Sequence, residues 1–230
     1  MKAIWWKILA VVLLLYIIIA GFLMEVPRVV DLNESIRNLY FHVPMWFTMF
    51  FICTAGAVYS VLYLAKFNLR YDNISNSLVT IGVLFGLFGY ATGYEWASFT
   101  WAKDVKGIEV LKILMIEPKM RFAAIALLVY GAYFVLRNSV DEVSMRARLS
   151  SIYNIFAFAT LIPLLYILPN SAEFSLHPGG SESPAFNSYD LDQRMRIIFY
   201  PAILGWTLLG VWIASLKIRY NNLLIKSLSN

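Results

Sequence analysis

Residues 43–65 read Val43-Pro-Met-Trp-Phe-Thr-Met-Phe-Phe-Ile-Cys-Thr-Ala-Gly-Ala-Val-Tyr-Ser-Val-Leu-Tyr-Leu-Ala65, a stretch of 23 residues without a charged side chain or a histidine. About 20 helical residues cross the roughly 30 Å hydrocarbon core of a bilayer. Strands of a membrane β-barrel are shorter and alternate in polarity, which this stretch does not. It therefore predicts a helix that spans a membrane.

Five further apolar runs repeat this pattern along the chain, at residues 8–24, 74–94, 122–136, 149–172 and 197–216. Of the 230 residues, 60% are hydrophobic and 14% are charged, against roughly 25% charged in soluble domains. The run 122–136 is short, so its helix must extend backwards past Arg121 and Lys119, whose long side chains can reach the membrane surface. The sequence predicts an all-α membrane protein with six transmembrane helices in a single integral membrane domain, residues 1–230. The predicted spans are residues 6–26, 43–66, 74–94, 118–137, 149–170 and 197–217, with outward loops at 27–42, 95–117 and 171–196.

Three features of the composition narrow the class of protein. No small-residue cleavage pattern closes the first apolar run, so we expect a retained helix rather than a signal peptide. The single cysteine, Cys53, excludes a disulfide within the chain, and the absence of Cys-x-x-Cys-His excludes a c-type cytochrome. The basic residues that raise the sequence pI to about 9.2 are scattered over the membrane flanks, so we expect no nucleic-acid partner.

The distribution of Lys and Arg predicts the orientation in the membrane. Ten of these residues lie on the side of the two termini and nine on the other side, but five of the nine fall within residues 103–121. Without that unusual segment the ratio is ten to four, and the positive-inside rule places both termini in the cytoplasm. We expect a bacterial inner-membrane protein whose loops 27–42, 95–117 and 171–196 face outwards.

The chain has only two histidines, His42 and His177, and four predicted spans separate them. An even number of crossings places both on the same, outward side. Neutral imidazole is a common axial ligand of heme iron, so two histidines on one face could hold one heme from both sides. The alternative for His42 is an interfacial histidine that hydrogen-bonds a carbonyl, and the alternative for the loop around His177 is a flexible connector. The glycines 179 and 180 beside His177 would leave room for a flat macrocycle.

Two tryptophans and two arginines complete the candidate site. Trp96 and Trp101 follow the third span and could form an apolar shelf for a porphyrin face, although an interfacial aromatic belt explains them equally well. Arg194 and Arg196 precede the last span and could pair with heme propionates, or could be helix-end charges at the membrane surface.

The six apolar runs contain no Asp, Glu, Lys, Arg or His. Ion-coupled transporters usually place such groups within the bilayer, and electron carriers with two histidine ligands hold heme from within their helices. Neither a proton pump nor a transmembrane electron carrier is supported by this pattern.

Three motifs at the ends of these spans resemble those of the heme-handling protein of bacterial cytochrome c maturation, the heme exporter protein C (CcmC) family of the cytochrome c assembly superfamily. The motifs are Asn38-Leu-Tyr-Phe-His42-Val-Pro44-Met-Trp46, the set Thr92-Gly93, Trp96-Ala97 and Thr100-Trp101, and Leu176-His177-Pro178-Gly179. The resemblance implies a protein, not an enzyme, that binds heme b non-covalently on the periplasmic face through axial ligands His42 and His177, with Trp96 and Trp101 in the heme shelf. It also implies delivery of that heme to a membrane-anchored heme chaperone, and possible partnership with an ATP-driven transporter complex.

One segment departs from the family pattern, which passes quickly from its tryptophans to an acidic-Pro-basic step and the fourth span. Here residues 102–116, which contain no aromatic residue, precede Glu117-Pro118-Lys119 and lengthen the segment by roughly one to two helical turns. We expect residues 107–116 to form an amphipathic interfacial turn, with heme still bound but with an altered shelf or chaperone contact. The competing hypothesis is a cofactor-free membrane transporter or scaffold subunit.

Overall fold

Helices of very different lengths make up the part of the chain that the structure describes. The computed structural model describes residues 4–27, 33–105, 107–173, 175–177 and 191–228. Its elements in chain order are α1 (Trp5–Leu23), the 3₁₀ helix η1 (Asn33–Asn38), α2 (Leu39–Lys66), α3 (Leu69–Thr100), α4 (Ile108–Ile116), α5 (Pro118–Asn138), α6 (Val143–Ile162), the π-helical turn η2 (Pro163–Ile167), α7 (Leu168–Asn170) and α8 (Gln193–Leu228).

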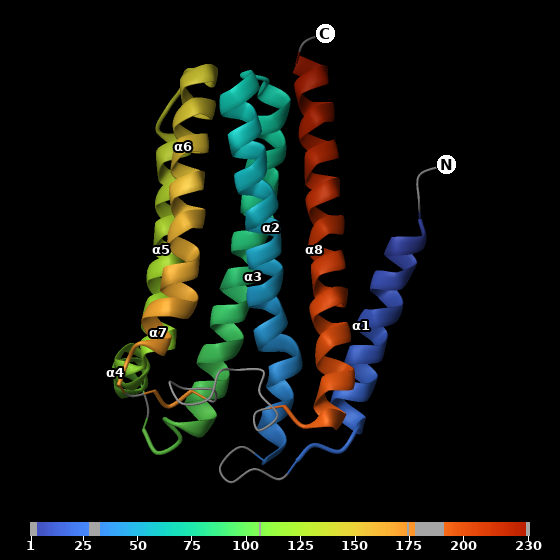
Figure 1. Cartoon of the computed structure of the whole chain (residues 1–230), viewed down its shortest axis with the longest axis vertical. Helices are drawn as coiled ribbons and strands as arrows, with labels where there is room; N and C mark the ends of the chain where they lie inside the picture. The colour runs from blue at the N-terminus through green and yellow to red at the C-terminus, as the bar shows by residue number, and fades with distance from the viewer. Residues whose placement is uncertain (1–3, 28–32, 106, 174, 178–190, 229–230) are drawn as a thin grey trace.

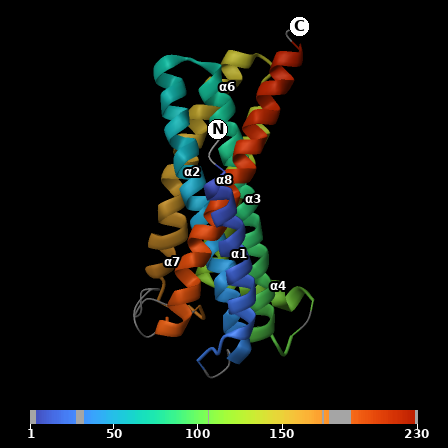
Figure 2. The same ribbon diagram turned by 90° about the vertical axis from the view of Figure 1, so that its right-hand side faces the viewer.

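Six helical segments of the described chain are long and apolar enough to cross a membrane, which confirms the predicted fold class. Five of them are α1, α2 together with most of η1, α3, α5 and α8, and the remaining one runs without a break through α6, η2 and α7. Figures 1 and 2 show these helices side by side along one axis, with short α4 lying across one end. Helix α1 begins and α8 ends toward the opposite end of the bundle.

Most helices extend beyond their predicted spans, and this corrects the predicted loops in three places. Helix α2 begins at Leu39, so His42 lies within its first turns and not in the loop 27–42. Helix α3 continues to Thr100, which makes Trp96 helical, and α8 begins at Gln193, which makes Arg194 and Arg196 helical. The reason is that a helix satisfies its own backbone hydrogen bonds and can continue past the apolar run into the polar interfacial region.

Proline positions account for two further irregularities. Pro44 lies inside α2, five residues after Leu39, where it has no N–H to donate to the carbonyl of Tyr40. The second half of the predicted loop 27–42 is helical, because η1 leads directly into the first turn of α2. Pro163 opens the π-helical turn η2 within the long segment formed by α6, η2 and α7, as expected where a residue cannot donate its helical hydrogen bond.

Four glycines of α3 pack tightly against α2. Gly82, Gly86, Gly89 and Gly93 face Cys53, Met49, Trp46 and His42 of α2, respectively. A Cβ atom at Gly82 would lie 2.5 Å from the Cys53 Sγ, and one at Gly93 would lie 2.6 Å from the His42 Cε1. Small residues that let two backbones approach are a common basis of helix association in membranes. The glycines therefore determine how close α2 can lie to α3.

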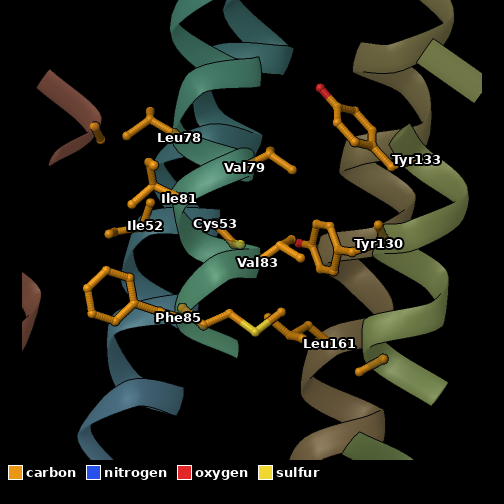
Figure 3. Close-up of a cluster of buried hydrophobic side chains, with 14 of the residues drawn as sticks. Ile52, Cys53, Leu78, Val79, Ile81, Val83, Phe85, Tyr130, Tyr133 and Leu161 are labelled. Carbon is orange, nitrogen blue, oxygen red and sulfur yellow. The ribbon is translucent and has the colours of Figure 1, made fainter. Parts of the chain in front are cut away.

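The largest buried cluster lies beside this contact, between α2, α3, α5 and α6, and includes Ile52, Cys53, Phe85, Tyr130 and Leu161 (Figure 3). Aliphatic and aromatic side chains also cover the outer surface of the bundle, where Leu128 is 72% exposed and Val135 is 71% exposed. In a bilayer, lipid tails rather than water contact such residues, so their exposure is the arrangement expected of a multi-pass membrane protein.

We expect an added methyl group to be tolerated very differently at two glycines. In Gly82→Ala the new Cβ would meet the Cys53 Sγ and the Met49 carbonyl oxygen, so overpacking should destabilise the protein by about 1–3 kcal/mol. In the control Gly131→Ala nothing lies within 4 Å of the added Cβ, and the higher helix propensity of Ala should keep or raise stability. Thermal unfolding midpoints of the two detergent-purified variants test this, and equal midpoints would contradict the packing described here.

Candidate heme site

The two histidine rings, which lie far apart in the sequence, meet at the end of the bundle near α4. Their ring centroids are 6.2 Å apart, with an angle of 42° between the ring planes. An imidazole nitrogen binds a metal ion at roughly 2 Å, as zinc sites show, so two rings that share one metal ion have centres on the order of 6 Å apart. The separation is therefore one that a single metal ion between the rings could bridge.

His42 is held rigidly between α2 and α3. Its side chain is buried, and the Nδ1 atom lies 2.8 Å from the carbonyl oxygen of Gly89 and 3.3 Å from the Thr92 Oγ1. Because a carbonyl oxygen can only accept a hydrogen bond, the neutral ring donates from Nδ1 and keeps the lone pair on Nε2. Histidines that bind metal ions usually donate their other N–H to a backbone carbonyl or a carboxylate in this way. From the sequence, a hydrogen bond to a carbonyl is the alternative to heme ligation by His42. The structure contains that hydrogen bond, to Gly89, and it leaves the Nε2 atom with a lone pair for a metal ion.

The two predicted tryptophans lie against His177. The centroid of the His177 ring is 6.1 Å from that of Trp96 and 5.9 Å from that of Trp101, and both pairs meet edge to face. The tryptophan rings also contact each other at 5.7 Å. Such edge-to-face pairs are a favourable arrangement of aromatic rings. Four of the six predicted site residues therefore form one cluster of rings.

The elements behind the tryptophans keep them in place. Trp96 lies in the last turn of α3 and donates from Nε1 to the Ser35 Oγ at 3.1 Å. Trp101 caps α3 and packs with Ala97, Val110 and Leu114. Residues 102–116, which depart from the family pattern, thus contain helix α4. Its buried residues Val110 and Leu114 support Trp101. The helical turn predicted at residues 107–116 is present as α4, and its interfacial position stays a prediction.

A cavity of about 490 Å³ opens on the side of Trp96 that faces η1. Its walls include Phe22, Phe41 and Phe99, together with Arg37 and Glu34, which form an ion pair at 2.6 Å. Sites for small molecules are usually clefts of this size with mostly apolar walls and a few polar groups. The cavity gives the aromatic cluster open space on one side.

The two predicted arginines make contacts near the start of α8. The Arg194 guanidinium lies 3.3 Å from Asp192 and 3.5 Å from Glu25, and Arg196 donates from Nε to the carbonyl of Leu191. The Arg194 backbone N–H and guanidinium hold the pKa of the Asp192 carboxyl below its usual range. The predicted pairing with propionates stays a prediction.

Several contacts of the cluster were not predicted from the sequence. Gly89, Thr92 and Gly93 surround the His42 ring. The glycines of the third span follow one another at intervals of four, three and four residues, a pattern that indicates close packing of two membrane helices. Glu117, expected only as the start of the fourth helix, contacts the segment just before His177. The glycines 179 and 180 lie outside the described residues.

Comparison with known families gives one match. The model of the family described as cytochrome C assembly protein matches residues 2–177, which include both histidines and both tryptophans of the cluster. No curated protein matches the chain.

The two histidines should differ in reactivity in the heme-free protein. Diethyl pyrocarbonate modifies an accessible neutral imidazole, and His42 is only 9% exposed whereas His177 is half-buried. We expect His177 to react several times faster than His42 in the folded protein, and the rates to become equal after denaturation. Peptide mass spectrometry separates the two products, with His42→Gln and His177→Gln variants as controls for assignment. Equal rates in the folded protein would contradict the burial of His42.

Proposed function

The chain belongs to the cytochrome C assembly protein family, which gives it a role in cytochrome c maturation, and we propose that it performs this role by binding heme between His42 and His177. The observation that carries the proposal is the 6.2 Å separation of the two imidazole rings, which come from distant parts of the sequence. Heme is here the cargo of the protein. Its iron accepts nitrogen ligands on both faces of the porphyrin, and these two rings supply the donors.

The chemistry of the surrounding residues supports this cargo. Trp96 and Trp101 offer aromatic surface next to His177, where a flat porphyrin would replace contacts that are otherwise made to lipid or water. The hydrogen bond from His42 Nδ1 to the Gly89 carbonyl fixes the tautomer and increases the basicity of the second nitrogen. Arg194 and Arg196, near the same end of the bundle, are the candidates for pairing with propionates.

The position of the site suggests where bound heme would go next. The cluster lies at one end of the bundle, so the heme would be near a membrane surface and not at the bilayer centre. The charge distribution favours the periplasmic face of a bacterial inner membrane, with both termini cytoplasmic. From there the protein would present heme b, held without a covalent bond, to a membrane-anchored heme chaperone. It would act with partners of the maturation system, among them an ATP-driven transporter complex, and would catalyse no reaction of its own.

We expect the purified protein to bind added heme with a Soret band typical of a low-spin, six-coordinate iron. Removal of either ligand in His42→Ala or His177→Ala should shift that band and lower the affinity for heme by at least about tenfold, because loss of even a ligand's hydrogen-bond partner costs 10- to 100-fold in metal affinity. Spectrophotometric titration with hemin measures both quantities.

Gln193→Ala, which changes a polar residue at the start of α8, is a suitable control and should titrate like the parent protein. Absence of a Soret band in the parent protein after heme is supplied would favour the cofactor-free transporter or scaffold. Unchanged binding in both histidine variants would place heme elsewhere on the protein.

A further inference from the structure

Glu117 is a completely buried carboxylate between α4 and α5, with an exposed fraction of 0%. A buried charge is costly unless hydrogen bonds compensate for the lost water. Its Oε1 atom accepts from the Ser175 hydroxyl at 2.6 Å, and its Oε2 atom accepts from the Leu176 backbone N–H at 2.7 Å. Both oxygens of the carboxylate are thus used by the two residues that precede His177.

The Ser175 hydroxyl extends this contact to the histidine itself. The His177 backbone N–H donates to the Ser175 Oγ at 3.2 Å. Since a carboxylate only accepts, the hydroxyl hydrogen must point to Glu117, and a lone pair of the same oxygen is left for the His177 N–H. Hydrogen bonds to an ionised acceptor are about twice as strong as neutral ones, so this connection is well suited to fix the backbone at residues 175–177.

The two histidines therefore depend on different supports. His42 lies in a long helix, and its position follows from the packing of α2 on α3. Residues 175–177 belong to no helix, so regular backbone hydrogen bonds do not determine where His177 lies. We propose, on the basis of the heme-binding function above, that Glu117 is the positioning residue that holds His177 opposite His42 through Ser175 and Leu176.

Two substitutions test this role with heme bound. Glu117→Gln keeps the size of the side chain but leaves one oxygen for the three donors that now bond to the carboxylate, the Ser175 hydroxyl and the N–H groups of Leu176 and Lys119. Ser175→Ala removes the bridge to His177. Each should lower the affinity for heme by about 10- to 100-fold, as loss of a hydrogen-bond partner of a metal ligand does. The bound ferric heme should shift from the low-spin toward the five-coordinate high-spin form, and added imidazole should restore the low-spin absorption and electron paramagnetic resonance signals. Glu109→Gln, which removes an exposed ion pair with Lys112 in α4, is the matched control and should behave like the parent protein.

The two variants together distinguish loss of the positioning role of Glu117 from loss of folding. Glu117 also caps α5, because its Oε1 atom accepts from the Lys119 N–H at 3.4 Å, so thermal unfolding of Glu117→Gln must be measured beside binding. Ser175 donates to the same Glu117 Oε1 atom, but Ser175→Ala leaves the Glu117 carboxylate and its hydrogen bond from the Lys119 N–H in place. This variant therefore decides the question if Glu117→Gln does not fold. A folded variant with the spin state and affinity of the parent protein would overturn the positioning role. Absence of heme binding by the parent protein would instead overturn the proposed function.

Discussion

The close approach of α2 and α3 is the constraint on which the rest of the structure depends. Side chains at Gly82, Gly86, Gly89 or Gly93 would occupy space that α2 residues fill, and the last of these contacts is made by the His42 ring itself. The same approach brings the Gly89 carbonyl within 2.8 Å of the His42 Nδ1. Helix packing in the membrane thus determines both the place and the tautomer of the first proposed ligand.

Apart from Trp96, which belongs to α3, the second half of the site is built from segments outside the six long helices. Helix α4 supports Trp101, Trp101 and Trp96 contact His177, and Glu117 holds the residues before that histidine. A residue in a packed helix is held by regular backbone hydrogen bonds and by its neighbours in the bundle, whereas a short non-helical segment can move when a few hydrogen bonds break. Under the proposed function, His42 would keep its position while His177 would be the ligand that adjusts when heme enters or leaves.

The sequence predicted the architecture better than the details of the site. Apolar runs showed six membrane helices, because the bilayer requires helices of known length, and counting the spans placed His42 and His177 on one side. Helix ends such as Leu39 were not predictable from hydropathy, since a helix can continue into the polar interface. The role of Glu117 was also hidden, because the residues that surround its carboxylate lie 58 and 59 positions further along the chain.

The most direct test of the account is the position of the iron. A cryo-electron microscopy map of the heme-loaded protein in a lipid nanodisc would show whether iron density lies between the two rings that are now 6.2 Å apart. We predict density continuous with His42 on one face of the porphyrin and with His177 on the other, and with Trp96 and Trp101 beside the macrocycle. Heme density that contacts neither histidine, or only one of them, would contradict the central claim that this end of the bundle is a two-histidine heme site.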